Sequence, residues 1–424
     1  MMQRTAMANT LSHPERDGAV VPLWRNRDYM LLWGGQVVSV LGGGISGIAF
    51  PLLVLALTHS PAQAGLVGAF GGLPYLVLSL PAGALVDRWD RKRVMILCDV
   101  GRGINAATVP VAAATISLHM PQLYLNAVVE GTLFVFFNVA EVAALPRVVP
   151  TEQLPKASGQ NEAASFASAL VAPPLGGFLF QALGRTIPFL ADAISYGASV
   201  VSLLLITTAF QGERVLETAS LRSEIKAGLV WLWRQPLIRF IAVLTGGLNF
   251  AGNAVYLIVI ILARQEGVSP AVIGVMLAIA SLGGFVGSLA APYFQRRFGF
   301  GQVIIATVWV QALLFPLFAV TTSPYLLGAI FAGVTLCGPI FNAVQLSYRL
   351  SIIPDELQGR VNSAVRLVTY GSIPPGIALA GILIQGIGAR SAILVYAGVM
   401  VVLALAAVAN PHVRHAQRLG SARG

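Results

Sequence analysis

The sequence carries little charge for its length. Only 10% of its 424 residues are Asp, Glu, Lys or Arg, whereas soluble domains carry about 25%. Hydrophobic residues make up 56% of the chain. This balance leaves little room for a soluble domain, and we therefore do not expect an enzyme.

Sequence motifs for nucleotides and metals are also missing. Only three lysines occur, Lys92, Lys156 and Lys226, and none completes the ATP-binding pattern Gly-x-x-x-x-Gly-Lys-Ser/Thr. No His-Glu-x-x-His zinc motif is present. The two cysteines, Cys98 and Cys337, lie singly in apolar segments, so we expect neither a disulfide framework nor a metal site. No cofactor is expected.

Long apolar runs are abundant. A helix needs about 20 apolar residues to cross the hydrocarbon core of a membrane. Only helices satisfy their own backbone hydrogen bonds in lipid, so each run is predicted to be a transmembrane helix. The twelve predicted spans are 29–57, 64–86, 94–118, 123–146, 159–183, 188–210, 237–262, 270–294, 303–321, 325–348, 362–385 and 390–410.

Basic residues fall almost entirely on one side of these spans. With the N-terminus inside, the cytoplasmic segments hold 21 Lys and Arg residues, and the opposite loops hold only Arg185, Arg264 and Arg390. Cytoplasmic loops carry such an excess. We therefore expect a bacterial inner-membrane protein with both termini in the cytoplasm. The net charge of +10 has the same origin and does not indicate nucleic-acid binding, because no continuous basic face is present.

The two halves of the sequence resemble each other. Three short matches occur in the same order at offsets of 201 to 204 residues: Phe137-Asn138 with Phe341-Asn342, Pro150 with Pro354, and Pro173-Pro174 with Pro374-Pro375. The predicted fold class is thus an all-α membrane protein with twelve transmembrane helices in two six-helix, pseudo-symmetric halves. In transporters built from such parallel repeats, the substrate site lies between the repeats.

These boundaries give five predicted segments. They are a cytoplasmic tail at 1–28, an N-terminal half at 29–210, a linker at 211–236, a C-terminal half at 237–410 and a cytoplasmic tail at 411–424. In the linker, Leu221, Ile225, Leu229 and Leu232 recur at helical spacing. We predict an amphipathic helix along the membrane surface there. A covalent tether without a specific role is an equally good interpretation.

The loop between spans 2 and 3, residues 83–93, is the most specific motif. It reads Gly-Ala-Leu-Val-Asp-Arg-Trp-Asp-Arg-Lys-Arg and resembles the loop signature of the major facilitator superfamily, with Asp90 where many members carry Gly. We predict a gating latch made of Gly83, Asp87, Arg88, Arg91, Lys92, Arg93, Asp99 and Arg102. Ordinary anchoring by basic residues is the alternative.

Further stretches resemble the enterobactin-exporter and macrolide-efflux branch of that superfamily. They are residues 23–29, 137–138, 221–232 and 353–361, and the likeness extends over essentially the whole chain. The resemblance implies a monomeric secondary transporter that exports a small amphipathic compound, such as a drug, natural product or siderophore-like molecule, in exchange for protons. A solute importer or lipid flippase of the same fold is one alternative, and a membrane sensor that transports nothing is another.

Span 5 carries a second motif of small residues. Ser168, Ala172, Pro173, Gly176 and Gly177 resemble the antiporter signature Gly-x-x-x-Gly-Pro-x-x-Gly-Gly, with Ser and Ala replacing two glycines. Small residues and proline allow a bent helix to pack closely against a partner. The motif indicates antiport or, alternatively, packing alone.

Charged residues inside the spans are functional candidates, because each acid at mid-membrane costs about 2.5–3.5 kcal/mol. Asp99 and Arg102 are spaced to pair on one helix face. On span 4, Glu130 and Glu141 share a face with Asn138, and we take Glu130 as the leading proton carrier. For Glu141, a pair with Arg147 or the latch arginines is an equal alternative.

Two further charges complete the predicted cavity. Asp192 lies near the start of span 6, where capping of the helix N-terminus is the alternative. Arg366 on span 11 is predicted to hold an anionic substrate or to pair with an acid of span 4. The predicted cavity set is therefore Glu130, Asn138, Glu141, Asp192 and Arg366.

Overall fold

A computed structural model describes residues 22–115, 117–211, 221–353 and 357–414. All regular structure in these ranges is helical, and twelve segments are long and apolar enough to span a membrane. The first six spans are α1 (Arg27–Thr58), α2 (Pro61–Val86), α3 (Arg91–Thr115), α4 (Met120–Val148), α5 (Leu154–Ala182) and α6 (Ile187–Leu205). The other six are α8 (Pro236–Gln265), α9 (Pro270–Arg297), α10 (Phe300–Leu314) with α11 (Leu317–Val320), α12 (Pro324–Ile352), α13 (Gln358–Gly371) with α14 (Ile373–Ile387), and α15 (Ala389–Ala409).

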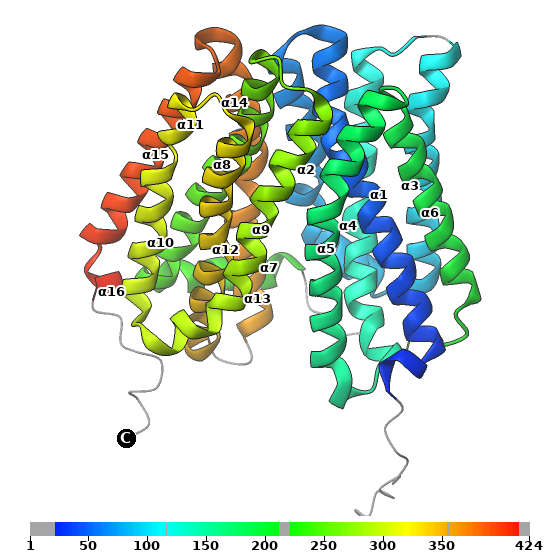
Figure 1. Cartoon of the computed structure of the whole chain (residues 1–424). Coiled ribbons are helices and arrows are strands. Elements are labelled where there is room, and N and C mark those ends of the chain that lie inside the picture. The colour runs from blue at the N-terminus through cyan, green and yellow to red at the C-terminus, as the bar shows by residue number, and fades with distance from the viewer. Residues whose placement is uncertain (1–21, 116, 212–220, 354–356, 415–424) are drawn as a thin grey trace, which may run out of the picture.

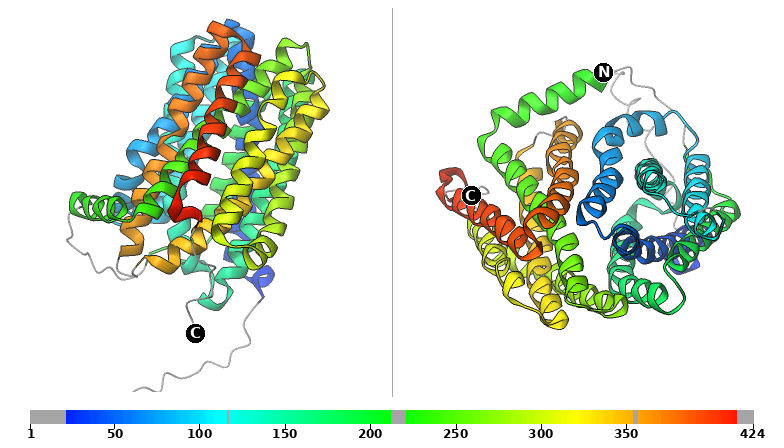
Figure 2. Two further views of the ribbon diagram at one scale, coloured as in Figure 1. Left: turned by 90° about the vertical axis from the view of Figure 1, so that its left-hand side faces the viewer. Right: turned by 90° about the horizontal axis from the view of Figure 1, so that it is seen from above.

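The six-plus-six organisation predicted from the sequence is confirmed. Seen from above, the spans of each half gather on opposite sides of the molecule (Figure 2). The helix bounds repeat as well: α4 and α12 begin and end 204 residues apart. Of the matched sequence pairs, Pro354 lies outside the described residues.

Proline decides where two spans are interrupted. α10 and α11 meet at Pro316, which has no N–H to donate to the preceding turn. α13 and α14 meet at Ser372, just before Pro374-Pro375. The equivalent Pro173-Pro174 pair lies inside an uninterrupted α5. The same dipeptide therefore interrupts the helix in one half and is accommodated in the other.

The two halves meet along two helix pairs. α5 lies against α9, and α2 lies against α14 (Figure 1). Near the middle of the spans, the Phe166 and Phe285 rings of α5 and α9 are 6.2 Å apart. The Tyr75 ring of α2 is 5.3 Å from the Tyr370 ring, which lies at the end of α13 just before α14. From there the ribbons converge toward the end away from the termini and diverge toward the termini (Figure 1).

The linker contains the predicted helix, α7 (Leu221–Arg234), which runs crosswise to the spans (Figure 2). It packs on α13: Leu232 is buried with Val361, and a Cβ on Gly228 would lie 2.3 Å from the Arg360 carbonyl oxygen. α7 therefore lies across the spans and packs against the C-terminal half. The side chains of 221–227, including part of the predicted stripe, lie outside the described residues, as do the tails 1–21 and 415–424.

Glycine sets the distance between α9 and α12. A Cβ on Gly283 would lie only 1.8 Å from the Ala332 carbonyl oxygen, so the two backbones could not keep their present separation. Small residues allow such close approach of membrane helices.

We predict that Gly283→Ala lowers the stability of the protein by about 1–3 kcal/mol, because the backbones must separate to admit a methyl group. Gly338→Ala on α12 is the matched control, since no atom lies within 4 Å of the added Cβ. Thermal unfolding in detergent measures both variants. Equal midpoints for the two variants would contradict this role of Gly283.

Candidate functional site

One large cavity of about 740 Å³ lies between the halves. It is built mostly by the N-terminal half, since α1 to α6 contribute 31 of its 35 lining residues. The C-terminal half adds only Asn253, Tyr256, Leu257 and Ile377. Among the described residues, every Asp, Glu, Arg or Lys that lines the cavity therefore comes from the N-terminal half, so the charges of the site do not follow the symmetry of the two repeats.

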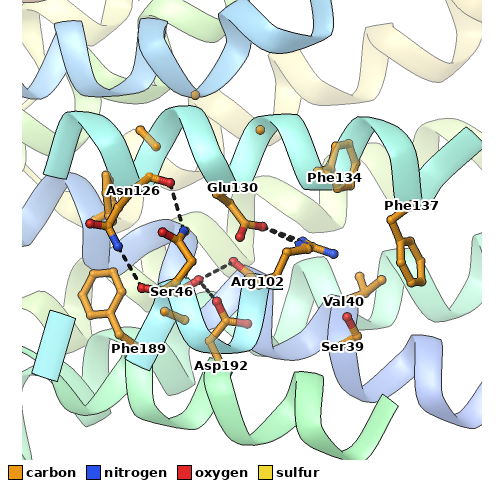
Figure 3. A pocket seen from close by; sticks show the side chains of 18 of the residues that line it. Ser39, Val40, Ser46, Arg102, Asn126, Glu130, Phe134, Phe137, Phe189 and Asp192 are labelled. Atoms are coloured by element: carbon orange, nitrogen blue, oxygen red, sulfur yellow. Dashed lines mark hydrogen bonds and ion pairs between the residues drawn. The ribbon is translucent and has the colours of Figure 1, made fainter. Parts of the chain in front are cut away.

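Arg102 lies at the centre of the polar part of this cavity (Figure 3). Its Nη2 is 2.6 Å and its Nε 2.8 Å from Oε1 of Glu130, which also accepts a hydrogen bond of 3.1 Å from the Tyr196 hydroxyl. The guanidinium lies 4.3 Å from the centre of the Tyr196 ring. One cation thus joins α3, α4 and α6 through an ion pair and a cation–π contact.

Asp99 lies one helical turn before Arg102 and is fully buried. Its Oδ2 accepts a 2.6 Å hydrogen bond from Ser199 of α6, and its Oδ1 is 3.8 Å from Nη1 of Arg102. Asp99 and Arg102, which are three residues apart on α3, therefore lie side by side in the structure. The fold places both residues inside the bundle, next to Glu130, and not beside the loop 83–93 with which they were grouped.

Glu141 lines the same cavity nearer the end where the termini lie. Among the described residues it has no hydrogen bond or ion pair, so neither Arg147 nor an arginine of the loop 83–93 is its partner here. Its face of the cavity also carries Asn138 on the same helix. Two donors that line the cavity on α1, Trp33 Nε1 and Gln36 Nε2, are buried without a hydrogen-bond partner.

Asp192 lies deeper, toward the converging end of the halves. It is buried, and its Oδ2 accepts a 2.5 Å hydrogen bond from Ser46 of α1. The free backbone N–H groups of a helix are those of its first turn. Because α6 begins at Ile187, Asp192 lies beyond that turn and cannot cap it. Its side chain points into the cavity (Figure 3), so the capping alternative does not describe it.

Two asparagines join α3 and α4 at this depth. Asn105 donates to the Asn126 carbonyl oxygen at 3.0 Å, and Asn126 donates to the Asn105 carbonyl oxygen at 2.8 Å. Both line the cavity. Neither asparagine belongs to the cavity set predicted from the sequence, although Asn126 lies one turn before Glu130 on the face that carries Asn138 and Glu141. Ser46 and Tyr196 had no comparable signal, because their partners are on distant segments.

Arg366 does not reach the cavity. Its Nη2 donates a 2.9 Å hydrogen bond to the Tyr75 hydroxyl of α2, and its guanidinium is 5.9 Å from the Tyr370 ring centre. Within the described residues it therefore contacts no acid of α4, and the expected pairing is wrong for this conformation. Arg102, which is closer to α4 within the same half, occupies that position instead.

The loop 83–93 connects the ends of the N-terminal spans. Arg91 pairs with Asp87 at 3.1 Å and donates to the Ala143 carbonyl oxygen, while Lys92 donates to the Ile206 carbonyl oxygen at 2.6 Å. Asp90 caps α3 by accepting from the Arg93 N–H. These contacts all lie within the N-terminal half. Asp87 and Arg88 are exposed, and Gly83 has open space beside it.

The small-residue motif of α5 faces both halves. A Cβ on Gly176 would lie 2.6 Å from the Ile45 carbonyl oxygen of α1, and one on Gly177 would lie 2.2 Å from the Pro270 carbonyl oxygen of α9. A Cβ on Gly274 of α9 would in turn lie 2.3 Å from the Pro173 carbonyl oxygen. Ser168 and Ala172 are buried. The motif thus lies at the crossing of α5 with a helix of each half.

Comparison with known proteins gives a consistent result. The sequence model of the Major Facilitator Superfamily matches residues 32–373 and, in a second match, residues 239–423. Multidrug efflux pump Tap of Mycolicibacterium fortuitum is 29% identical over 403 residues, which cover 91% of this chain and 96% of the pump. Enterobactin exporter EntS of Salmonella choleraesuis (strain SC-B67) is 26% identical over 84% of each chain. Among solved structures, the nucleoside transporter NupG superposes with a TM-score of 0.69 at 16% identity, covering 91% of this chain and 98% of NupG.

The ion pair of Arg102 and Glu130 gives a testable coupling. Arg102→Met leaves Glu130 and Asp99 without their cation, so we expect a marked loss of thermal stability. Adding Glu130→Gln to that variant should restore part of it, with a non-additivity equivalent to about 1–3 kcal/mol in a double-mutant cycle. Additive effects of the two substitutions would contradict a direct interaction.

Proposed function

The chain belongs to the Major Facilitator Superfamily, and we propose that it is a secondary transporter that exports a small amphipathic compound across the bacterial inner membrane. It acts as a carrier and catalyses no covalent reaction. The observation that carries the proposal is the cavity between the halves, whose walls are mainly apolar but contain a compact charged network. Two of the relatives, Tap and EntS, are named as an efflux pump and an exporter, which supports the direction.

The charges of the cavity favour a cationic ligand. Three carboxylates, Glu130, Glu141 and Asp192, line it against one guanidinium, Arg102, which leaves a formal charge of −2 when all are ionised. Aromatic rings of Trp33, Phe50, Phe134, Phe137, Phe189 and Tyr256 also line it. Electrostatic attraction is stronger beside the low-dielectric walls of a protein than in bulk water. An amphipathic amine fits these walls better than an anion of similar size.

We place the coupling proton on Glu141 or Asp192 and not first on Glu130. Oε1 of Glu130 already accepts three hydrogen bonds, two from Arg102 and one from Tyr196. Glu141 has no such partner among the described residues, so either a proton or a cationic substrate can approach it without displacing a donor. If proton and substrate compete for one carboxylate, binding of either one releases the other, which couples their transport in opposite directions.

Alternating access supplies the transport step. In this conformation the halves are in close backbone contact at the end away from the termini, where Gly177 faces Pro270 and Gly381 faces Pro61, and we propose that the cavity opens on the side of the termini. The excess of Lys and Arg in the loops on that side supports a cytoplasmic location for it. We therefore propose that the structure represents the state that takes up substrate from the cytoplasm. The loop 83–93, whose Asp87 is exposed here, contacts the other half when this side closes.

Drug susceptibility tests the function and the acid together. A bacterial strain that lacks its own major exporters should gain resistance to cationic amphipathic antibiotics when it expresses this chain. Glu141→Gln should remove most of that resistance, because it removes the carboxylate that substrate and proton share. Glu152→Gln, at an exposed acid outside the cavity, is the matched control and should keep it.

Each outcome of this panel is informative. Greater sensitivity on expression of the chain would support an importer, and no change for any compound class would contradict transport of drugs. Full resistance in the Glu141→Gln strain would exclude that residue as the shared acid.

A separate substitution tests the loop 83–93. Asp87→Asn removes the carboxylate that pairs with Arg91 while leaving the buried contacts of the loop in place. We expect normal folding and membrane insertion but slower efflux of a cationic dye, because the state closed to the cytoplasm is less favoured. Efflux at the unmodified rate would contradict the gating role.

A further inference from the structure

A second internal repeat lies at the end where the halves converge. The second span of each half begins with the same tripeptide, at 60–62 and again at 269–271, Ser-Pro-Ala. The fifth span of each half ends with a related pentapeptide, Gly-Phe-Leu-Phe-Gln at 177–181 and Gly-Ile-Leu-Ile-Gln at 381–385. The pentapeptides are 204 residues apart, the offset that relates α4 to α12.

The structure pairs these repeats across the two halves. Gln385 of α14 reaches the start of α2, where its Oε1 accepts hydrogen bonds from the Ser60 hydroxyl at 2.7 Å and the Ala62 N–H at 3.2 Å. Gln181 of α5 reaches the start of α9, where its Oε1 accepts from the Ala271 N–H at 3.2 Å. Each half therefore supplies one glutamine and receives one.

The glycine of each pentapeptide makes this approach possible. A Cβ on Gly381 would lie 2.6 Å from the Pro61 carbonyl oxygen, and one on Gly177 would lie 2.2 Å from the Pro270 carbonyl oxygen. One turn later, the glutamine side chain extends over the helix start. We call each set of Gly, Gln and the facing Ser-Pro-Ala a cross-cap.

The cross-caps serve groups that a helix cannot satisfy alone. The first N–H groups of any helix have no partner within it, and a side-chain oxygen placed there stabilises the helix. Ser60 and Ser269 already cap α2 and α9 through the N–H groups of Gln63 and Val272. The glutamines add a further acceptor, and that acceptor comes from the opposite half. It is available only while this end of the bundle is closed.

We propose that Gln181 and Gln385 are positioning residues that hold the cavity closed at this end, and that both cross-caps release when the transporter opens to the opposite side. Because the two glutamines occupy equivalent places, their contributions to the closed state are similar and add. The proposal goes beyond export itself, since it names the contacts that set the balance between the two states of the cycle.

The rate at which a cavity thiol reacts from outside the cell measures how often this end opens. Val109 lines the cavity and is buried, so Val109→Cys provides the thiol once Cys98 and Cys337 are replaced by serine. A membrane-impermeant maleimide is the probe, applied to intact cells. Gln181→Met and Gln385→Met remove the acceptor at nearly constant size, whereas Gln181→Glu and Gln385→Glu keep an acceptor oxygen and place an anion at a helix start, which is favourable.

We expect each Gln→Met substitution to raise the labelling rate about fivefold and the double substitution about 25-fold, as for the loss of one and two helix caps. The Gln→Glu variants should label at the unmodified rate or more slowly. Permeabilised cells, in which the reagent also enters from the open side, should label equally fast in all variants, which shows that the variants are folded.

Two results would overturn the proposal: an unchanged rate in the double Gln→Met variant, or equal acceleration by Met and Glu. Fast labelling of the unmodified glutamine background in intact cells would instead contradict the proposed membrane orientation. Failure of the cross-caps and failure of the proposed function are thus separated.

Discussion

The ion pair between Arg102 and Glu130 is the interaction around which the N-terminal half is organised. A guanidinium inside a membrane bundle is costly unless it is paired. Arg102 meets this requirement with Glu130 on α4, Asp99 on its own helix and the ring of Tyr196 on α6. Those contacts fix the rotation of three spans about their axes. They thereby determine which faces of α3, α4 and α6 form the wall of the cavity.

The symmetry of the backbone does not extend to its chemistry. Both halves use the same helix order and closely matched helix bounds, yet all charged groups of the cavity lie in the first half. The second half presents mainly Tyr256, Leu257 and Ile377 to the same space. A duplicated scaffold in which one copy carries the charges allows the other to move past it without separating ion pairs across the interface. That arrangement suits two bodies that rock against each other.

Contacts between the halves are instead short-range and polar or steric. Near the middle they include aromatic pairs, the Arg366–Tyr75 hydrogen bond and the hydrogen bond from Ser281 to the Ala169 carbonyl oxygen, and at the converging end they include the cross-caps of Gln181 and Gln385. A neutral hydrogen bond such as those of the cross-caps contributes about 1 kcal/mol, and one with a charged donor such as Arg366 contributes about 1.5–3 kcal/mol. Interfaces of this kind can be broken and formed again repeatedly, whereas a buried ion pair between the halves would resist opening. The buried ion pair of Arg102 and Glu130 therefore lies within a half, whereas the contacts named here between the halves are weaker.

The sequence by itself determined the number of spans, their duplication and the concentration of acids on span 4. These features follow from local composition and spacing, because lipid requires continuous apolar helices and a helix places every third or fourth residue on one face. Only the tertiary structure decided which charged side chains contact each other. Arg102 was expected near the loop 83–93 and Arg366 near span 4, but the packing of α3 against α4 and α6 placed Arg102 beside Glu130 and left Arg366 with Tyr75. The partners of Gln181 and Gln385 are on the opposite half for the same reason: a contact between distant segments depends on how the helices are arranged, which no local pattern encodes.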